Sequence, residues 1–372
     1  MVEITNPETA LKWLEQQDHQ TQIWFALRSA LRAIPGVYSS NEDVEPSNLT
    51  VALPCFRTGL LAAAAAVTPR LNTLTFEKRV TSAISFINVS ATDGGRQICS
   101  HKAAESALNC ITSRNSAAHA AKALDYCAQA VDYDSIGSVS FASATHDSQN
   151  PNIWNALWPG YPETGLEFEM PGTLGDEWAD LRGQMGRKRS DWEFWVEWYQ
   201  GILKGIPLPW SLTQSIALEV KNADWDTGAG RVAEAIAPIY LPYKLERQIA
   251  ELQAELAFAR LKYEGIGDNN LPEPIENLTF EQLPTEIWNN LEALRTEKNA
   301  SHPDPNRLRL LEQRLTEGAA KLGRLLKDVA YDETKQVVSG AIGAGIALNW
   351  NKIQLQIAKI SQTVIEWIAY LN

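Results

Sequence analysis

The C-terminal segment Ile346–Leu371 reads IALNWNKIQLQIAKISQTVIEWIAYL. Apolar side chains recur in it at alternating spacings of four and three, which is typical of a helix that packs one seam against other helices. The seam consists of Ile346, Trp350, Ile353, Ile357, Ile360, Val364, Trp367 and Leu371. We predict these residues as candidate interaction residues, covered either by helices of the same chain or by a partner.

Two further seams precede this segment, one from Leu245 to Tyr263 and one from Leu308 to Val329. Between them we expect a helix that begins at Pro284, and we expect Asp304 to cap the next helix. The connections between these helices are short, which favours antiparallel packing. The sequence therefore predicts an antiparallel helical bundle over residues 244–372.

The rest of the chain is also predicted to be helical, in three parts. Residues 1–135 are rich in alanine and form a helical domain, whereas the Pro and Gly residues of 136–176 indicate an ordered linker. Residues 177–243 form a Trp-rich helical module. Ser138–Ser143 is the one stretch that could form a short strand. The predicted class is therefore an all-α, multi-part protein.

Eight of the thirteen tryptophans lie between Trp154 and Trp225. Trp192, Trp195 and Tyr199 share one face of a predicted helix, which indicates a buried aromatic core. Trp198 lies beside that face, so we expect it to point partly outward and we include it among the candidate interaction residues.

Composition excludes several classes of function. The 372 residues carry 33 Lys plus Arg against 45 Asp plus Glu, a net charge of -12, which disfavours nucleic acid as a partner. No apolar run reaches the length of a permanent transmembrane helix, and the acidic start lacks the pattern of a secretory leader. We therefore expect a cytoplasmic protein. The four cysteines form no CxxC pair, so no disulfide framework, structural metal or cofactor is expected.

Three small groups of residues are candidates for a site of chemistry. His101 and Glu105 lie four residues apart on a predicted helix and could act in a metal site, although a metal needs at least three donors. Cys55 would be an activated thiol if Pro54 began a helix. Asp224 and Asp226 could hold a cation, whereas the neighbouring TGAGR stretch, residues 227–231, is expected to be a helix start.

Two motifs carry a resemblance. Residues 195–210 read WVEWYQGILKGIPLPW, and residues 265–276 read GIGDNNLPEPIE. Together they resemble a set of uncharacterised bacterial proteins with a WYxxxLxG helix, a GIGHNNPPE-like turn and a helical C-terminal region. Asp268 stands where that pattern has His, and Leu271 where it has Pro, so no role of the imidazole is carried over. The resemblance implies a bacterial setting and no known activity.

The predicted function is that of a non-catalytic helical interaction or scaffold protein, which binds a protein partner or itself through its C-terminal helices. One alternative is a membrane-disrupting effector of a toxin or defence system that releases its C-terminal helix onto a bilayer. A second alternative is a metal-dependent enzyme around His101 and Glu105.

Overall fold

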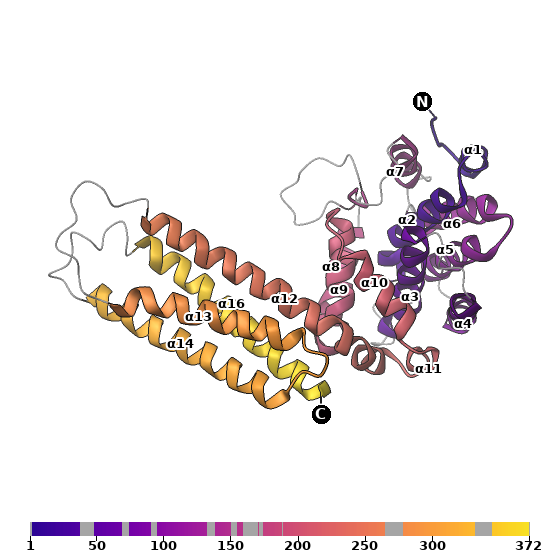
Figure 1. Cartoon of the computed structure of the whole chain (residues 1–372). Helices are drawn as coiled ribbons and strands as arrows, with labels where there is room; N and C mark the ends of the chain where they lie inside the picture. Colours follow the sequence, from indigo (N-terminus) through magenta and orange to yellow (C-terminus); the bar gives the residue numbers. More distant parts are fainter. Residues whose placement is uncertain are drawn as a thin grey trace. The chain divides into compact units, whose positions relative to one another are not determined.

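The computed structural model describes residues 2–37, 48–68, 74–90, 95–131, 138–149, 155–158, 170, 174–187, 189–264, 278–331 and 344–371. Within these ranges the chain is all-α and contains no strand, which confirms the predicted class (Figure 1). The chain divides into two compact units, Met1–Ile236 and Ala237–Asn372, and the boundary falls within one helix, α12.

The helices of the first unit have ends that the local sequence explains. Asn6 accepts a hydrogen bond from the backbone N–H of Thr9 at 2.9 Å, and Asp18 accepts one from Thr21 at 2.7 Å, so both residues cap a helix start. The elements are α1 (Pro7–Leu14), α2 (His19–Arg32), the 3₁₀ helix η1 (Ile34–Val37), α3 (Asn48–Val67), α4 (Leu74–Ser90), α5 (Gly95–Thr112), α6 (Ser116–Val131), α7 (Ser138–Gln149), α8 (Leu174–Arg187), α9 (Arg189–Leu203), α10 (Trp210–Glu219), α11 (Asn222–Trp225) and the first residues of α12 (Ala229–Glu264).

Helix α2 lies at the centre of this unit, because α3, α5, α6 and α7 all pack against it. The helices around it approach closely because small residues line their contacts. Ala33, Ala103, Cys127 and Ala130 form one such buried cluster between the end of α2, α5 and α6. Alanine in this half of the chain therefore serves close packing as well as helix propensity.

The structure corrects two boundaries that the sequence suggested. Ser138–Gln149 forms helix α7, where an ordered linker and a short strand were expected; its small inward residues, such as Ser140 and Ala144, are fully buried against the core. The Trp-rich segment is not a separate module, because most of it belongs to the first unit. The reason is that Phe56 of α3 lies among the aromatic rings of α9, as described below.

The second unit is a four-helix bundle of α12, α13 (Leu278–Lys298), α14 (Pro305–Tyr331) and α16 (Ala344–Leu371) (Figure 1). Glu246 of α12 pairs with Lys298 of α13 at 3.1 Å, and Gln253, further along α12, donates to the earlier Glu292 at 2.6 Å, so these two helices are antiparallel. Lys244 of α12 lies 3.9 Å from Glu366 of α16, whereas Glu255 pairs with the earlier Lys352, so α12 and α16 are antiparallel too. Helix α14 packs against both α13 and α16 and completes the bundle.

The predicted helix starts in this unit have different outcomes. Asp304 precedes α14, and its carboxylate accepts a hydrogen bond from the N–H of Asn306 at 2.9 Å, so the expected start is confirmed. The predicted start at Pro284 is wrong, because α13 begins at Leu278. A proline inside a helix removes one backbone hydrogen bond, and the helix continues through it here.

Candidate functional site

The C-terminal seam faces the inside of the bundle. Its described members Ile353, Ile357, Ile360, Val364 and Trp367 are buried, and Leu371 is half-buried. The side chains of Ile346 and Trp350 lie outside the described residues. The covering helices belong to the same chain, since α14 packs against α16 and α12 is joined to it by ion pairs. In this arrangement the described part of the seam holds the bundle together and is not open to a partner.

The outer face of α16 carries a second stripe that the sequence analysis did not identify. Its residues also recur at spacings of four and three, all are exposed, and none is charged. Two of them are large and apolar: Leu355 is 57% exposed and Ile365 is 54% exposed. We call this set the outer stripe; it consists of Asn351, Leu355, Ala358, Gln362, Ile365 and Ala369.

The charged residues of α16 lie beside the outer stripe, toward α12. Lys352 pairs with Glu255, and Glu366 lies near Lys244. Helix α14 differs, because its exposed face carries several charged side chains, and Leu310 is its large exposed apolar residue. The outer face of α16 is therefore less charged than the exposed face of α14.

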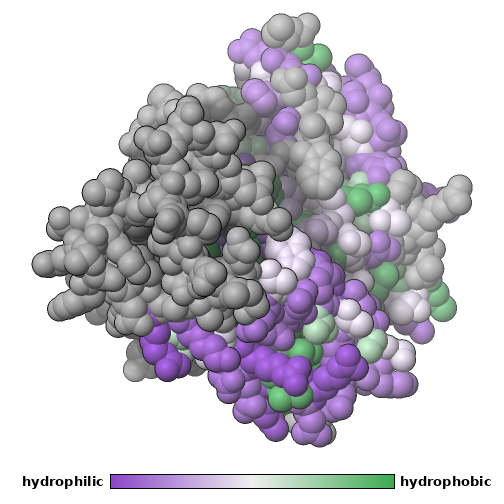
Figure 2. Space-filling view, turned by 60° about the vertical axis from the view of Figure 1, so that its left-hand side comes forward, coloured by the Kyte–Doolittle hydropathy of each residue, from purple (hydrophilic) through white to green (hydrophobic). Residues whose placement is uncertain are grey.

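Figure 2 shows one face of the molecule, on which the coloured hydrophobic residues form small separate areas among hydrophilic ones. Single exposed apolar residues of this kind are ordinary for a folded protein. A regular spacing, as on α16, is the feature that distinguishes a helix-binding face from such scatter.

Trp198 does not point outward, and that prediction is wrong. Its side chain is fully buried, and its ring lies near Phe56 and Trp195, with centroids 6.5 Å and 6.2 Å away. Gly59 of α3 makes this possible, because a Cβ atom there would come within 3.0 Å of the Trp198 ring. Helix α3 therefore covers the face of α9 that carries Trp198, in addition to the face that carries Trp195 and Tyr199. The sequence of α9 alone does not indicate this second contact.

His101 and Glu105 are not joined in a site. His101 is buried, with Nδ1 2.8 Å from the carbonyl oxygen of Gln97 one turn earlier. Glu105 instead pairs with Lys102 at 2.7 Å and accepts a hydrogen bond from Asn88 at 3.4 Å. Among the described residues, no group of three or more His, Cys, Asp and Glu side chains could hold a metal ion.

Cys55 is not an activated thiol. Pro54 and Cys55 lie inside α3, away from its start, so no helix N-terminus stabilises the thiolate. Burial raises the pKa of Cys55 to about 12 and that of Cys110 also to about 12. Both thiols are therefore protonated and unreactive at neutral pH.

The two aspartates beside Trp225 face arginines. Asp224 pairs with Arg231 at 3.0 Å, and the charge of Asp226 acts on Arg57. The neighbouring glycine, Gly228, has φ +111° and directly precedes α12, which confirms the stretch 227–231 as a helix start. A cation bound at Asp224 would have to displace Arg231.

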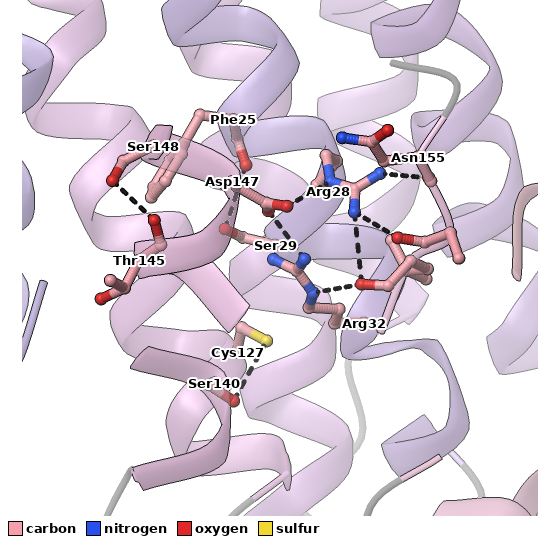
Figure 3. Close-up of polar contacts among 12 residues, drawn as sticks. Phe25, Arg28, Ser29, Arg32, Cys127, Ser140, Thr145, Asp147, Ser148 and Asn155 are labelled. Atoms are coloured by element: carbon pink, nitrogen blue, oxygen red, sulfur yellow. Dashed lines mark hydrogen bonds and ion pairs between the residues drawn. The ribbon is translucent and has the colours of Figure 1, made fainter. Parts of the chain in front are cut away.

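Among the described residues, an arginine cluster between α2 and α7 is an extensive buried polar contact (Figure 3). The carboxylate of Asp147 in α7 forms ion pairs with Arg28 at 3.0 Å and with Arg32 at 2.7 Å. All three side chains are at most 2% exposed. Arg28 and Arg32 lie one turn apart on α2, so both reach the same carboxylate. Burial lowers the pKa of Arg28, and the charge of Asp147 opposes that shift.

The same two arginines bind the main chain of residues 155–157. Arg28 donates to the carbonyl oxygens of Asn155 at 2.9 Å and Ala156 at 2.7 Å, and Arg32 donates to that of Leu157 at 2.9 Å (Figure 3). The Leu157 N–H in turn donates to the carbonyl of Leu203 at the end of α9. The cluster thus connects α2, α7 and α9 through a short irregular segment and is structural in role.

A second arginine cluster lies where α3 and α4 meet the segment around α11. The guanidinium of Arg57 is buried and stacks 5.0 Å from the centre of the Trp225 ring. It donates to Asn222 Oδ1 at 2.9 Å and to Ser82 Oγ at 3.3 Å. Arg79 of α4 donates to the carbonyl of Val220. This group differs from the first one because Arg79, Ser82 and Asn222 are partly exposed.

Sequence reasoning missed both arginine clusters. Arginine on an amphipathic helix ordinarily lies on the solvent face, and its buried partners here come from distant segments. One available signal was the position of Arg28 and Arg32 within the same turns as Ile23, Leu27 and Leu31, which surround them with core residues.

Comparisons with protein-family models, with curated proteins and with solved structures returned no match. In the part of the chain that the structure describes, no helix combines the length and hydrophobicity needed to cross a membrane. The WYxxxLxG motif lies on α9 and the turn after it, and the GIGDNNLPEPIE motif falls outside the described residues. The resemblance stays a prediction.

Proposed function

We propose that this chain is a non-catalytic helical interaction protein that associates through the outer stripe of α16. The observation that supports this function is the uncharged four-three spacing of six exposed residues on one helix face. A helix face of this kind buries Leu355 and Ile365 when a second helix lies along it. The described part of the inward seam is occupied by the bundle, whereas the outer stripe is exposed and open to association.

The partner that fits this stripe is a second copy of α16 in the opposite direction. In a two-fold pair centred on Gln362, Leu355 lies opposite Ala369 of the second copy, and Ile365 lies nearly level with Ala358. Each large side chain thereby meets a small one, which permits close packing of the two helices. The stripe is complementary to itself.

The charges beside the stripe agree with the same register. Lys359 and Glu366 lie on one side of the stripe, at nearly equal distances from Gln362. In the two-fold pair, Lys359 of each copy lies close to Glu366 of the other, so two attractive contacts form. A single helix pair buries little area, and we therefore expect a weak, concentration-dependent dimer.

Sedimentation equilibrium of the full chain over a range of concentrations tests this function. We expect a reversible dimer whose affinity falls about tenfold or more in Leu355→Glu, because a buried carboxylate would face an apolar surface. Leu310→Glu on α14 is the matched control and should dimerise like the unaltered chain. A chain that is monomeric at every concentration, or equal dimerisation of Leu355→Glu, would exclude the proposal.

A charge exchange tests the register separately. Lys359→Glu should weaken the dimer, because two like-charged contacts replace two attractive ones. Adding Glu366→Lys to it should restore the affinity. If the double variant is no stronger than Lys359→Glu, the two-fold register centred on Gln362 is wrong.

The membrane-disrupting alternative requires α16 to leave the bundle and expose its buried seam. No contact among the described residues favours that change over the folded bundle, so this alternative stays a prediction. Leakage of dye from anionic vesicles on addition of the full chain would support it, and its absence would count against it.

A further inference from the structure

The second arginine cluster contains a buried cation, Arg57, that has no carboxylate in contact with it among the described residues. The Arg57 side chain is 1% exposed, and among the described residues its hydrogen-bond acceptors, Asn222 and Ser82, are both neutral. One of its terminal nitrogens, Nη1, is buried and has no acceptor within the part of the chain that the structure describes. Burying a guanidinium costs free energy unless an anion or strong acceptors offset the charge. Arg57 therefore has unused capacity to donate.

A second guanidinium lies close to it. Arg79 donates through Nη1 to the Val220 carbonyl, and its Nε is buried without an acceptor. Burial lowers the pKa of Arg57 to about 10, Asp226 opposes the shift, and the nearby charge of Arg79 adds to it. Asp226, whose charge acts on Arg57, is exposed to solvent. Arg57 thus lies near a second cation and is opposed by a solvent-exposed carboxylate.

The donors around these two arginines match an oxyanion. We propose that Arg57, Arg79, Ser82 and Asn222 form a binding site for a phosphate group. Guanidinium groups bind phosphate oxygens through paired N–H donors, and a hydroxyl and an amide add neutral donors. Trp225 packs against Arg57 and fixes its plane. Arg79, Ser82 and Asn222 are partly exposed, so a ligand reaches Arg57 from their side.

The site is independent of the outer stripe, because its residues belong to the first unit and those of the stripe to the second. The shared chemistry is the phosphate group, which reaches the site either as the free ion or on an organic carrier. Inorganic phosphate and phosphoserine distinguish these two sources. Tighter binding of phosphoserine indicates a carried phosphate, and tighter binding of inorganic phosphate indicates the free ion; binding of either supports the site.

Thermal unfolding of the full chain in sodium phosphate, compared with sodium chloride of equal ionic strength, tests the proposal. A ligand that binds the folded state raises the melting temperature, so phosphate should raise it more than chloride does. Arg79→Gln should lose the phosphate-specific rise. Arg231→Gln removes an equal charge from an exposed arginine in the first turn of α12 and should keep the phosphate-specific rise.

Two further variants keep the proposal testable if Arg79→Gln folds poorly. Asp226→Asn removes the opposing charge and should bind phosphate more tightly in calorimetric titration. Ser82→Asp places a carboxylate beside Arg57, so it should raise the melting temperature without phosphate and abolish the phosphate response. Equal effects of phosphate and chloride on the unaltered chain, or an unchanged phosphate response in Arg79→Gln or Ser82→Asp, would overturn the site.

Discussion

Arg32 of α2 and Asp147 of α7 form an ion pair of 2.7 Å in which neither side chain is exposed to solvent. Arg28 shares the same carboxylate, so one aspartate balances two arginines in the core. A buried ion pair is costly to form, and it becomes costlier when one member is removed. Asp147 is therefore the residue on which this contact depends.

Asp147→Asn should destabilise the first unit strongly. The substitution leaves two buried guanidinium groups without a counter-charge, for which we expect a loss of about 3–5 kcal/mol. Urea denaturation followed by circular dichroism measures it. Asp224→Asn, which removes the carboxylate paired with the exposed Arg231, is the control and should cost less than about 1 kcal/mol. Equal losses in the two variants would contradict a buried role for Asp147.

The two faces of α16 should differ sharply in their contribution to stability. Ile360 is fully buried in the bundle, so Ile360→Ala should cost about 2–5 kcal/mol through lost burial and the cavity that remains. Leu355 is exposed, and Leu355→Ala should change the stability of the monomer by less than about 0.5 kcal/mol. Chemical denaturation at low protein concentration, where the monomer predominates, measures both. A free energy of unfolding that is unchanged in Ile360→Ala would show that the seam is not packed as described.

The sequence was sufficient for features that depend on local periodicity. The heptad spacing of Ile353, Ile357 and Ile360 predicted a buried seam, and Asp304 before Pro305 predicted a helix start, because both signals lie within a few turns of one helix. It was insufficient where a distant segment decides the outcome. Trp198 is buried because Gly59 leaves room for its ring, and no pattern within α9 contains that information.

The candidate sites show the same limit. The inward seam was predicted as an interaction surface, since periodicity shows that a helix face is covered and does not show by which chain. The outer stripe was not predicted because only two of its six residues are large and apolar, and the others are alanine, asparagine and glutamine. Arg57 and Arg79 come together with Asn222 only through the tertiary packing of α3, α4 and α11.

The cysteines should differ in their reactivity toward alkylating reagents. Burial raises the pKa of Cys55 and of Cys110 to about 12, so the reactive thiolate is scarce at both sites. Cys99 is half-buried, and its pKa is also raised, mainly by burial. We expect N-ethylmaleimide at pH 8 to label Cys99 first, as followed by peptide mass spectrometry. All four should react in concentrated guanidinium, and rapid labelling of native Cys55 would contradict its burial.

The cap of α2 should make stability depend on acid pH. Backbone and side-chain hydrogen bonds from Thr21 lower the pKa of Asp18 below its ordinary 3.8. The folded state therefore favours the carboxylate, and this contribution is complete above pH 3.8 and disappears as the pH falls through the lowered folded-state pKa. Asp18→Ala should cost about 1 kcal/mol near neutral pH and progressively less in acid. Denaturation of the unaltered chain and of Asp18→Ala across this pH range measures the difference between their free energies of unfolding. A difference that stays constant with pH would contradict the prediction.

Arg28 and Arg32 donate hydrogen bonds to the backbone carbonyl oxygens of residues 155–157, and every amino acid has such a carbonyl. Ala156 is only partly buried, so its side chain can be substituted without loss of these hydrogen bonds. The arginines have no such freedom, because lysine lacks the planar fork that serves a carboxylate and a carbonyl at once. In related sequences, Arg28 and Arg32 should therefore be more strongly conserved than residues 155–157.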